Sequence, residues 1–308
     1  MGTTHTKVSD LTWPNDSFGR SVNVKIGLTD NSDDASFHFT QKSLILLRSI
    51  LDSTQPGSRD RAFSVIGPYG SGKSSFGLFA ASLLSHSNST WLDRTLQHLE
   101  GISPEISEYA LSITRASNKG YIPIIIQGQK GSINLALCQS LIDALCSIEN
   151  STPDVTAAFQ EKLFTARASI QSDTSGTTEV LELFKSAIHE VKLLGFSGII
   201  VVADEFGKFL ERASDEGNVP DLVTIQYLAE LSSSQTEANL ILLVLLHQSF
   251  RDYASTISES ERTEWNKIQG RFEQIDFSEE AQELYPLIAA CLNRSSDASR
   301  DKLVGKWA

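Results

Sequence analysis

The sequence predicts an α/β fold in three layers, with a mainly parallel five-stranded sheet between two layers of helices. Four short apolar runs are continuous rather than alternating and are rich in branched residues, which is typical of strands that are covered on both faces. Longer segments with apolar residues at helical spacing separate these runs. This alternation favours parallel strands that are joined by crossover helices.

The predicted strands follow one another at wide intervals. The four continuous runs are residues 62–66 (AFSVI), 122–126 (IPIII), 199–203 (IIVVA) and 240–246 (LILLVLL). A weaker run, Phe272 to Phe277, predicts a fifth strand nearer an edge of the sheet. A further short strand is possible at Val22–Ile26, in a segment that has no clear periodicity.

Helices are predicted between the strands. Apolar residues recur at helical spacing within 137–148 and within 180–191, as expected for helices that pack on a sheet. Residues 168–178 and 213–220 are polar and predict loops between helices, with Pro220 opening the next helix.

The composition of the chain indicates which kinds of partner and which cellular compartment to expect. The chain has 308 residues, a net charge of −12 and a pI near 5.0, so its overall field does not steer it to nucleic acid. A local basic patch stays possible. No apolar run reaches the ~18 residues of a membrane span, and no secretory signal is recognised. The cysteines, Cys138, Cys146 and Cys291, form no CxxC pair. We therefore expect a reducing, cytoplasmic location and no membrane partner.

A glycine-rich segment follows the first predicted strand. It reads Gly67-Pro-Tyr-Gly-Ser-Gly-Lys73-Ser74 and matches the pattern G-x-x-x-x-G-K-[ST] of a phosphate-binding P-loop. Glycines allow backbone N–H groups to turn toward phosphate oxygens, and the following helix adds its positive end. We expect Lys73 to reach the β- and γ-phosphates of ATP and Ser74 to ligate Mg²⁺. The expected nucleotide-contacting residues are Gly67, Pro68, Tyr69, Gly70, Ser71, Gly72, Lys73, Ser74 and Ser75.

Two carboxylates, Asp204 and Glu205, end the third predicted strand in "GIIVVADEFGKFLE". The carboxyl ends of parallel strands are where open α/β sheets bind ligands. We expect Asp204 to hold Mg²⁺ and Glu205 to orient and polarise the attacking water. In the alternative interpretation, the two carboxylates only cap a helix that begins at Gly207.

Other polar residues lie where they could complete an ATPase site. His247 and Gln248 follow the fourth strand and should emerge at the same edge as Asp204, with Gln248 the better candidate for a contact to the γ-phosphate or water. Arg262 and Arg271 precede the fifth strand, and either could reach the γ-phosphate in a neighbouring subunit. A capping or surface role for the first pair, and a solvated helix position for each arginine, are the alternatives.

The order of these features resembles that of AAA+ ATPases. The stretches "VVADEFGKFLE", "DLVTIQYLAELSSS", "LILLVLLHQSFRDYA" and "RTEWNKIQGRFEQIDFSE" further resemble the large P-loop ATPases of bacterial anti-phage defence islands, the BREX-type ATPases and their relatives. The resemblance covers roughly residues 38–290. It carries the nucleotide-site roles of Lys73, Ser74, Asp204 and Glu205 over to this chain. It also implies longer proteins with further domains.

Together the motifs and the resemblance imply an enzyme that binds ATP·Mg²⁺ and hydrolyses ATP to ADP and phosphate. Hydrolysis would reset a conformational switch in an anti-phage defence system, in a homo-oligomer or with partner proteins of that system. Two alternatives stay open. One is a DNA-handling motor or loader, for which the sequence shows no basic stripe. The other is a nucleotide-binding interaction scaffold that hydrolyses ATP very slowly.

The expected organisation has three parts. Residues 1–38 form an N-terminal extension, residues 39–280 the P-loop ATPase core, and residues 281–308 a helical segment that we interpret as the start of a lid. The chain stops about 30 residues after the last predicted strand. We therefore expect the front part of a longer protein, without a complete lid.

Overall fold

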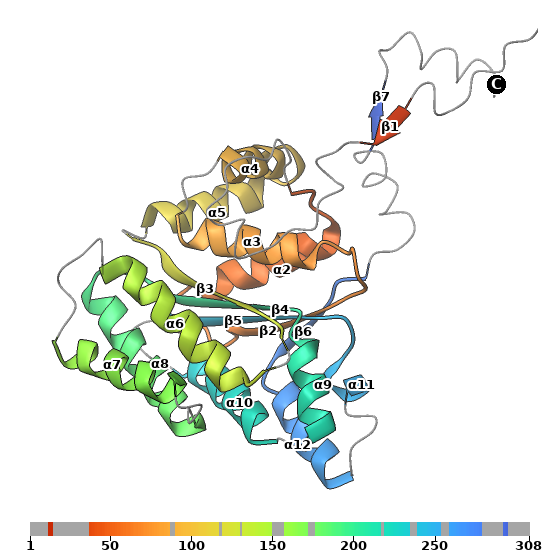
Figure 1. Ribbon diagram of the computed structural model, residues 1–308. Helices are drawn as coiled ribbons and strands as arrows, with labels where there is room; N and C mark the ends of the chain where they lie inside the picture. Colours follow the sequence, from red (N-terminus) through yellow and green to blue (C-terminus); the bar gives the residue numbers. More distant parts are fainter. Residues whose placement is uncertain are drawn as a thin grey trace, which may run out of the picture.

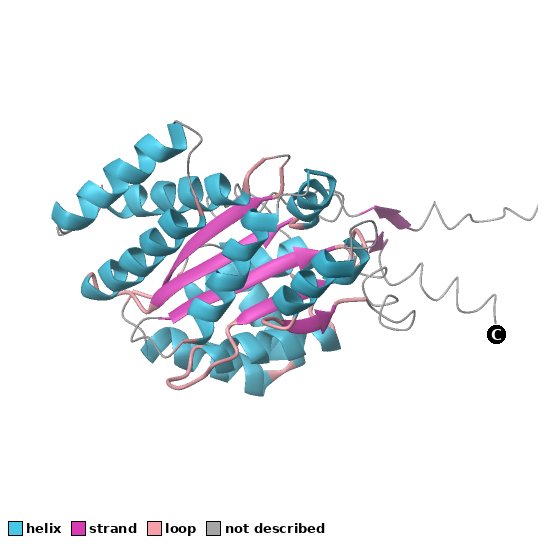
Figure 2. Ribbon diagram, turned by 90° about the horizontal axis from the view of Figure 1, so that it is seen from below, coloured by secondary structure: helices cyan, strands magenta, loops and turns pink. Residues whose placement is uncertain are grey.

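A computed structural model describes most of the chain and confirms the predicted sheet. The described residues are 12–14, 37–86, 90–116, 119–129, 131–149, 157–171, 176–216, 219–234, 239–253, 259–278 and 292–294. The five sheet strands are β2 (Ala62–Ile66), β3 (Tyr121–Gln127), β4 (Gly198–Asp204), β5 (Asn239–Leu246) and β6 (Glu273–Asp276). They lie in the order β3-β4-β5-β2-β6, and every neighbouring pair is parallel. Figure 2 shows these strands side by side, with β6 at one edge as the sequence predicts.

Helices cover both faces of the sheet, which gives the three layers seen in Figure 1. One face carries α2 (Gln41–Ser53), α3 (Lys73–Leu84), α4 (Thr90–Ile102) and α5 (Pro104–Ala116). The other carries α6 (Ile133–Glu149), α7 (Ala157–Gln171), α8 (Thr177–Leu193), α9 (Gly207–Glu216), α10 (Val219–Ser233), α11 (Phe250–Tyr253) and α12 (Glu259–Gln269).

The strands bury both faces because alternate residues enter two different cores. In β4, Ile199 and Val201 pack with α6, α8 and α10, whereas Ile200 and Val202 pack with α2 and α3. All seven residues of β4 are buried. A strand with two buried faces needs apolar residues at every position, which explains the continuous apolar runs in the sequence. Cys138 lies in the first of these cores and Cys146 is partly buried beside it.

Two predicted loops are wrong in part. α7 continues to Gln171 and α8 begins at Thr177, so most of 168–178 is helical. α9 extends to Glu216 and α10 begins at Val219, with Pro220 in its first turn. Alanine, glutamine and glutamate are good helix formers, so a polar sequence does not by itself exclude a helix.

The residues before α2 are fixed against α3. The rings of Phe37 and Phe79 stack at 6.1 Å between centroids, and the Phe37 N–H donates to Thr95 Oγ1 at 3.1 Å. Thr40 caps α2 in a capping box with Ser43. Phe37 also lies near the P-loop, since a Cβ built on Gly72 would be 3.7 Å from its ring.

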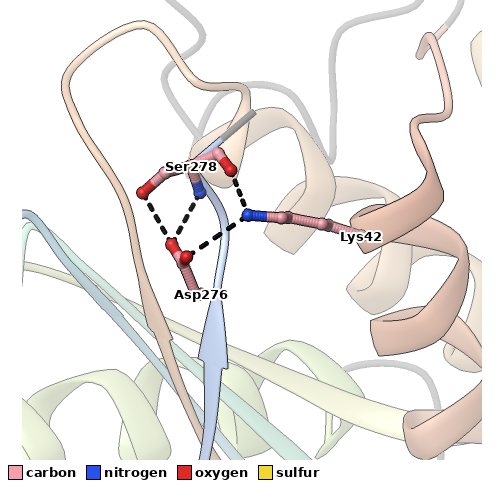
Figure 3. A network of polar contacts seen from close by, with 3 residues as sticks. All are labelled: Lys42, Asp276 and Ser278. Carbon is pink, nitrogen blue, oxygen red and sulfur yellow. Dashed lines mark hydrogen bonds and ion pairs between the residues drawn. The ribbon is translucent and has the colours of Figure 1, made fainter. Parts of the chain in front are cut away.

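A polar network joins α2 to the end of β6 (Figure 3). The Lys42 ammonium donates to Asp276 Oδ2 at 3.2 Å and to the Ser278 carbonyl oxygen. Asp276 Oδ1 accepts from the Ser278 N–H at 2.9 Å and from its hydroxyl at 2.6 Å. These hydrogen bonds fix the path of the chain as it leaves β6, next to the P-loop strand.

A separate two-stranded sheet brings together segments from opposite parts of the sequence. β1 (Thr12–Pro14) pairs antiparallel with β7 (Leu292–Arg294), with Trp13 opposite Asn293. The possible strand at Val22–Ile26 and Cys291 lie outside the described residues.

Candidate nucleotide site at the carboxyl edge of the sheet

Three parallel strands end together where the site is expected. β5 lies between β2, which precedes the P-loop, and β4, which ends at Asp204. The Gly67 N–H donates to the Leu246 carbonyl oxygen at 3.1 Å, and the Phe206 N–H donates to the Leu245 carbonyl oxygen at 3.1 Å. The P-loop, the Asp204–Glu205 pair and the end of β5 are therefore neighbours at one edge.

The P-loop backbone leaves the first turn of α3 available to an anion. Gly70 and Gly72 have φ of 79° and 87°, in the left-handed region that favours glycine. Gly72 is the N-cap of α3, and no side chain caps the helix. The first N–H groups of an α-helix have no partner within the helix and carry its positive end. The start of α3 therefore fits a phosphate group.

Gly67 has a different role. Its φ is not positive, but a Cβ at this position would lie 2.9 Å from the Phe277 carbonyl oxygen. The chain that leaves β6 thus passes directly against the start of the P-loop. A larger residue at Gly67 would push the two segments apart.

Lys73 is a buried cation whose hydrogen-bond acceptors are neutral. Its ammonium donates to the carbonyl oxygens of Gly67 at 2.6 Å and Pro68 at 2.7 Å, and to Ser71 Oγ at 3.3 Å. Burial lowers the pKa of Lys73 to about 8, and the nearby charge of Asp204 opposes this only in part. An anion held close to the loop would stabilise the charged form of Lys73.

Ser74 and Asp204 meet across the edge of the sheet. The Ser74 hydroxyl donates to Asp204 Oδ1 at 3.0 Å, and the Glu205 N–H donates to the same oxygen at 2.8 Å. Burial of the Asp204 carboxyl raises its pKa above the usual range. Hydroxyl and carboxylate oxygens are the ligands that Mg²⁺ prefers, so the two side chains fit the predicted metal role.

Glu205 has an unusual backbone that its neighbours hold in place. Its φ is 49°, which few non-glycine residues adopt. The Gly128 N–H donates to the Asp204 carbonyl oxygen at 2.8 Å, and a Cβ on Gly128 would lie 2.0 Å from the Glu205 carbonyl oxygen. The loop after β3 therefore packs closely on this turn. The Glu205 carboxylate pairs with the Lys208 ammonium at 2.5 Å.

The helix-cap alternative for the two carboxylates finds little support. α9 does begin at Gly207, as that interpretation requires. In the part of the chain that the structure describes, however, neither carboxylate accepts a hydrogen bond from an α9 backbone N–H.

His247, which follows β5, contacts the P-loop. The rings of His247 and Tyr69 stack with centroids 3.5 Å apart. Burial lowers the pKa of His247, and the charge of Lys73 lowers it further. His247 Nδ1 is buried and has no hydrogen-bond partner among the described residues. The Gln248 side chain is adjacent and exposed.

Tyr253 is a residue of this edge that the sequence did not point to. Burial raises its pKa to about 12, although the nearby backbone of His247 and Gln248 opposes this shift. A Cβ on Gly207 would lie 2.0 Å from the Tyr253 hydroxyl oxygen. Tyr253 therefore packs between the end of β5 and the start of α9. In the sequence it is only an aromatic residue in the short helix α11, and nothing there points to a role at the site.

Of the two candidate arginines, Arg271 is not brought to the P-loop. Arg271 directly precedes β6, and because β6 is parallel to β2 it lies at the amino edge of the sheet, opposite the P-loop. There it forms an ion pair with Glu230 of α10 at 3.0 Å. It also lines an open cleft of about 540 Å³ with Asp52, Asp60 and Glu273. Arg262 is exposed on α12.

Comparisons with known proteins give a likeness of overall structure. No family model matches the chain, and no curated protein matches it. Two solved structures of the Aeropyrum pernix ORC2 protein are similar to it. The ADPNP–ADP complexes are 14% identical over 91% of this chain, with a TM-score of 0.48, and the ADP form is 13% identical over 86%, with a TM-score of 0.46. The chain spans only 56% and 55% of those two chains. Among the described residues, no helix has the length and apolar character that crossing a bilayer requires.

Proposed function

We propose that this chain binds ATP·Mg²⁺ at the carboxyl edge of its sheet and hydrolyses ATP to ADP and phosphate. One observation supports the proposal above all others. The buried ammonium of Lys73, the uncapped start of α3 and the Ser74–Asp204 hydrogen bond lie together around one glycine-rich loop. Each of these groups is better satisfied by a bound polyphosphate and a hard cation than by its present surroundings.

Each residue has a distinct role in this proposal. The P-loop backbone and Lys73 bind the phosphates, and Ser74 and Asp204 hold the metal. Mg²⁺, when bound, neutralises charge on the phosphate oxygens. Glu205 accepts a proton from the attacking water and orients it. His247 and Gln248 lie at the neighbouring strand end, where they can contact the γ-phosphate.

The biological role rests on the sequence resemblance alone. By that resemblance, the domain is an AAA+-type switch in a bacterial anti-phage defence system, and hydrolysis resets its conformation. Its partners would be further copies of the chain or other proteins of the system. The acidic net charge of −12 does not favour DNA as a direct ligand.

Two substitutions separate binding from hydrolysis. Lys73→Ala removes the cation that faces the phosphates, so we expect ATP affinity to fall by tenfold or more, on the order of the energy of charge-assisted hydrogen bonds. Glu205→Gln keeps the shape of the side chain but loses the base, so we expect ATP binding to be retained and turnover to be lost. Titration calorimetry measures the first effect, and single-turnover hydrolysis the second.

One variant serves as a control for both measurements, and each measurement has a result that would contradict the proposal. Lys185→Met, in an exposed i,i+3 ion pair with Glu182 on α8, should change neither quantity. Equal ATP affinity in the wild type and Lys73→Ala would disprove the role of the loop. Unchanged turnover in Glu205→Gln would show that the catalytic carboxylate is elsewhere.

A further inference from the structure

The proposed base, Glu205, is engaged by a cation three residues further along the chain. Lys208 Nζ lies 2.5 Å from Glu205 Oε2. The Lys208 backbone N–H also donates to the Glu205 carbonyl oxygen at 3.1 Å. One turn of chain, between the end of β4 and the first residues of α9, thus holds both charges together.

The ion pair with Lys208 hinders Glu205 from acting as a general base. A base must present a carboxylate oxygen to water and accept its proton. The Lys208 ammonium occupies one of the two carboxylate oxygens of Glu205 that a water molecule would need. The pairing raises the pKa of Lys208, which favours its charged form.

The pair is placed to be broken rather than to hold the fold. The Lys208 side chain is 45% exposed and that of Glu205 is 29% exposed. Ion pairs in such positions contribute about 0–1 kcal/mol. The turn itself is fixed by other contacts, since the Asp204 carbonyl oxygen accepts from Gly128 and the Phe206 N–H donates to Leu245.

We propose that Lys208 is an inhibitory positioning residue, which holds Glu205 away from the attacking water until the pair opens. The inference rests on the proposed ATPase function, and it assigns to Lys208 the control of the hydrolysis rate. Removal of Lys208 should raise the rate of the chemical step. It should leave ATP affinity unchanged, because none of the expected phosphate contacts involves Lys208.

The test is single-turnover hydrolysis by the full chain, with ATP bound first and the reaction started by Mg²⁺. Lys208→Met keeps side-chain length and helix propensity, so the variant should fold, and it should hydrolyse ATP about two- to fivefold faster than the wild type, the factor that corresponds to such a pair. Lys208→Arg keeps the charge and should match the wild type. Lys185→Met breaks a more exposed i,i+3 pair with Glu182 on α8 and should have no effect.

Two further measurements show whether the effect acts through Glu205. The double variant Lys208→Met/Glu205→Gln should be as inactive as Glu205→Gln alone. Added salt should speed the wild type toward the Lys208→Met rate, since salt screens an exposed ion pair, and should change Lys208→Met much less.

The outcomes distinguish this inference from the proposed function. An active wild type with an equal or slower Lys208→Met, at unchanged ATP affinity, overturns the inference alone. A slower Lys208→Met would mean that Lys208 instead holds Glu205 in its productive position. If no variant hydrolyses ATP, both the function and the inference are wrong.

Discussion

At the scale of single residues, Lys73 lies in surroundings that do not suit its charge. It is only 5% exposed, and its three hydrogen-bond acceptors carry no net charge. Its pKa is lowered from 10.5 to about 8 by burial. Folding therefore favours the neutral amine, and a ligand with negative charge would favour the ammonium. The free energy that it costs to keep Lys73 charged in the fold would be recovered when an anionic nucleotide binds.

The lowered pKa predicts how stability depends on pH. Between about pH 8 and about pH 10.5 the unfolded chain binds more protons at Lys73 than the folded chain does, so the free energy of unfolding should rise with pH in this window. Relative to Lys73→Met, we expect the wild type to gain about 1–3 kcal/mol from about pH 7 to about pH 10. Urea unfolding of both proteins across this range checks the difference. A constant difference would mean that Lys73 keeps its ordinary pKa in the fold.

The close approach of Gly207 to Tyr253 predicts that a larger residue at position 207 lowers stability. A Cβ there would lie 2.0 Å from the Tyr253 hydroxyl oxygen, and Tyr253 is buried. We expect Gly207→Ala to lower the free energy of unfolding by about 1–3 kcal/mol. Gly101→Ala is the matched control, because a Cβ on Gly101 meets no atom within 4 Å and alanine suits α4 better than glycine. That variant should be stabilised by about 0.5–1 kcal/mol, and thermal unfolding measures both.

At the scale of elements, the strands were predictable and the ends of the helices were not. Continuous apolar runs are typical of strands whose two faces are both covered, so four of the five sheet strands could be found from them. The edge strand β6 could be found only from the weaker run Phe272 to Phe277. Polar residues at a helix end look the same as polar residues in a loop, so the predicted loops 168–178 and 213–220 overlap the ends of α7 and α9.

The sequence likewise predicts some contacts of the site and not others. The Ser74–Asp204 contact follows from two motifs after β2 and β4, which end at the same edge of the sheet with β5 between them. The stack of Tyr69 on His247 and the pairing of Lys208 with Glu205 depend on loop conformations that no periodicity encodes. Because β6 runs parallel to β2 and Arg271 precedes β6, Arg271 lies at the amino edge of the sheet, opposite the P-loop.

Within β2, one buried polar group predicts a stabilising substitution. Ser64 is fully buried, and its hydroxyl has no hydrogen-bond partner in the described part of the chain. An unsatisfied buried hydroxyl costs about 1–3 kcal/mol. Ser64→Ala should therefore raise the free energy of unfolding, by about 1 kcal/mol after the lost volume is counted. Ser43→Ala, which removes a capping-box hydroxyl from α2, should lower it by about 1 kcal/mol. A loss of stability in Ser64→Ala would mean that the hydroxyl has a partner after all.

At the scale of the whole molecule, Arg271 predicts a dependence on assembly. Arg271 lies far from the P-loop of its own chain and is half-exposed, so any action on a γ-phosphate has to occur in another copy. We expect the chain to be mainly monomeric without nucleotide, with ATPase activity per molecule that rises with protein concentration. Arg271→Ala should flatten this rise and leave ATP affinity nearly intact.

Mixing two inactive variants gives the decisive measurement. Arg271→Ala and Glu205→Gln each keep the half-site that the other lacks, so a site shared between subunits should recover part of the activity in the mixture. If the mixture stays inactive while the wild type depends on concentration, Arg271 is not the shared residue and Arg262 becomes the candidate. Activity per molecule that is independent of concentration would exclude assembly as the trigger.

The strand order also determines when the site can form during synthesis. β2, with its P-loop, is the first of the five sheet strands to leave the ribosome, but its two neighbours in the sheet, β5 and β6, are the last. Chain segments far apart in sequence must therefore meet before the P-loop is supported, and such pairings form slowly. Until β6 emerges, the backbone groups of β2 on that side have no strand to pair with, and such an unpaired strand edge favours chaperone binding and aggregation. ATP could protect the chain from proteolysis only after Phe277 has docked against Gly67.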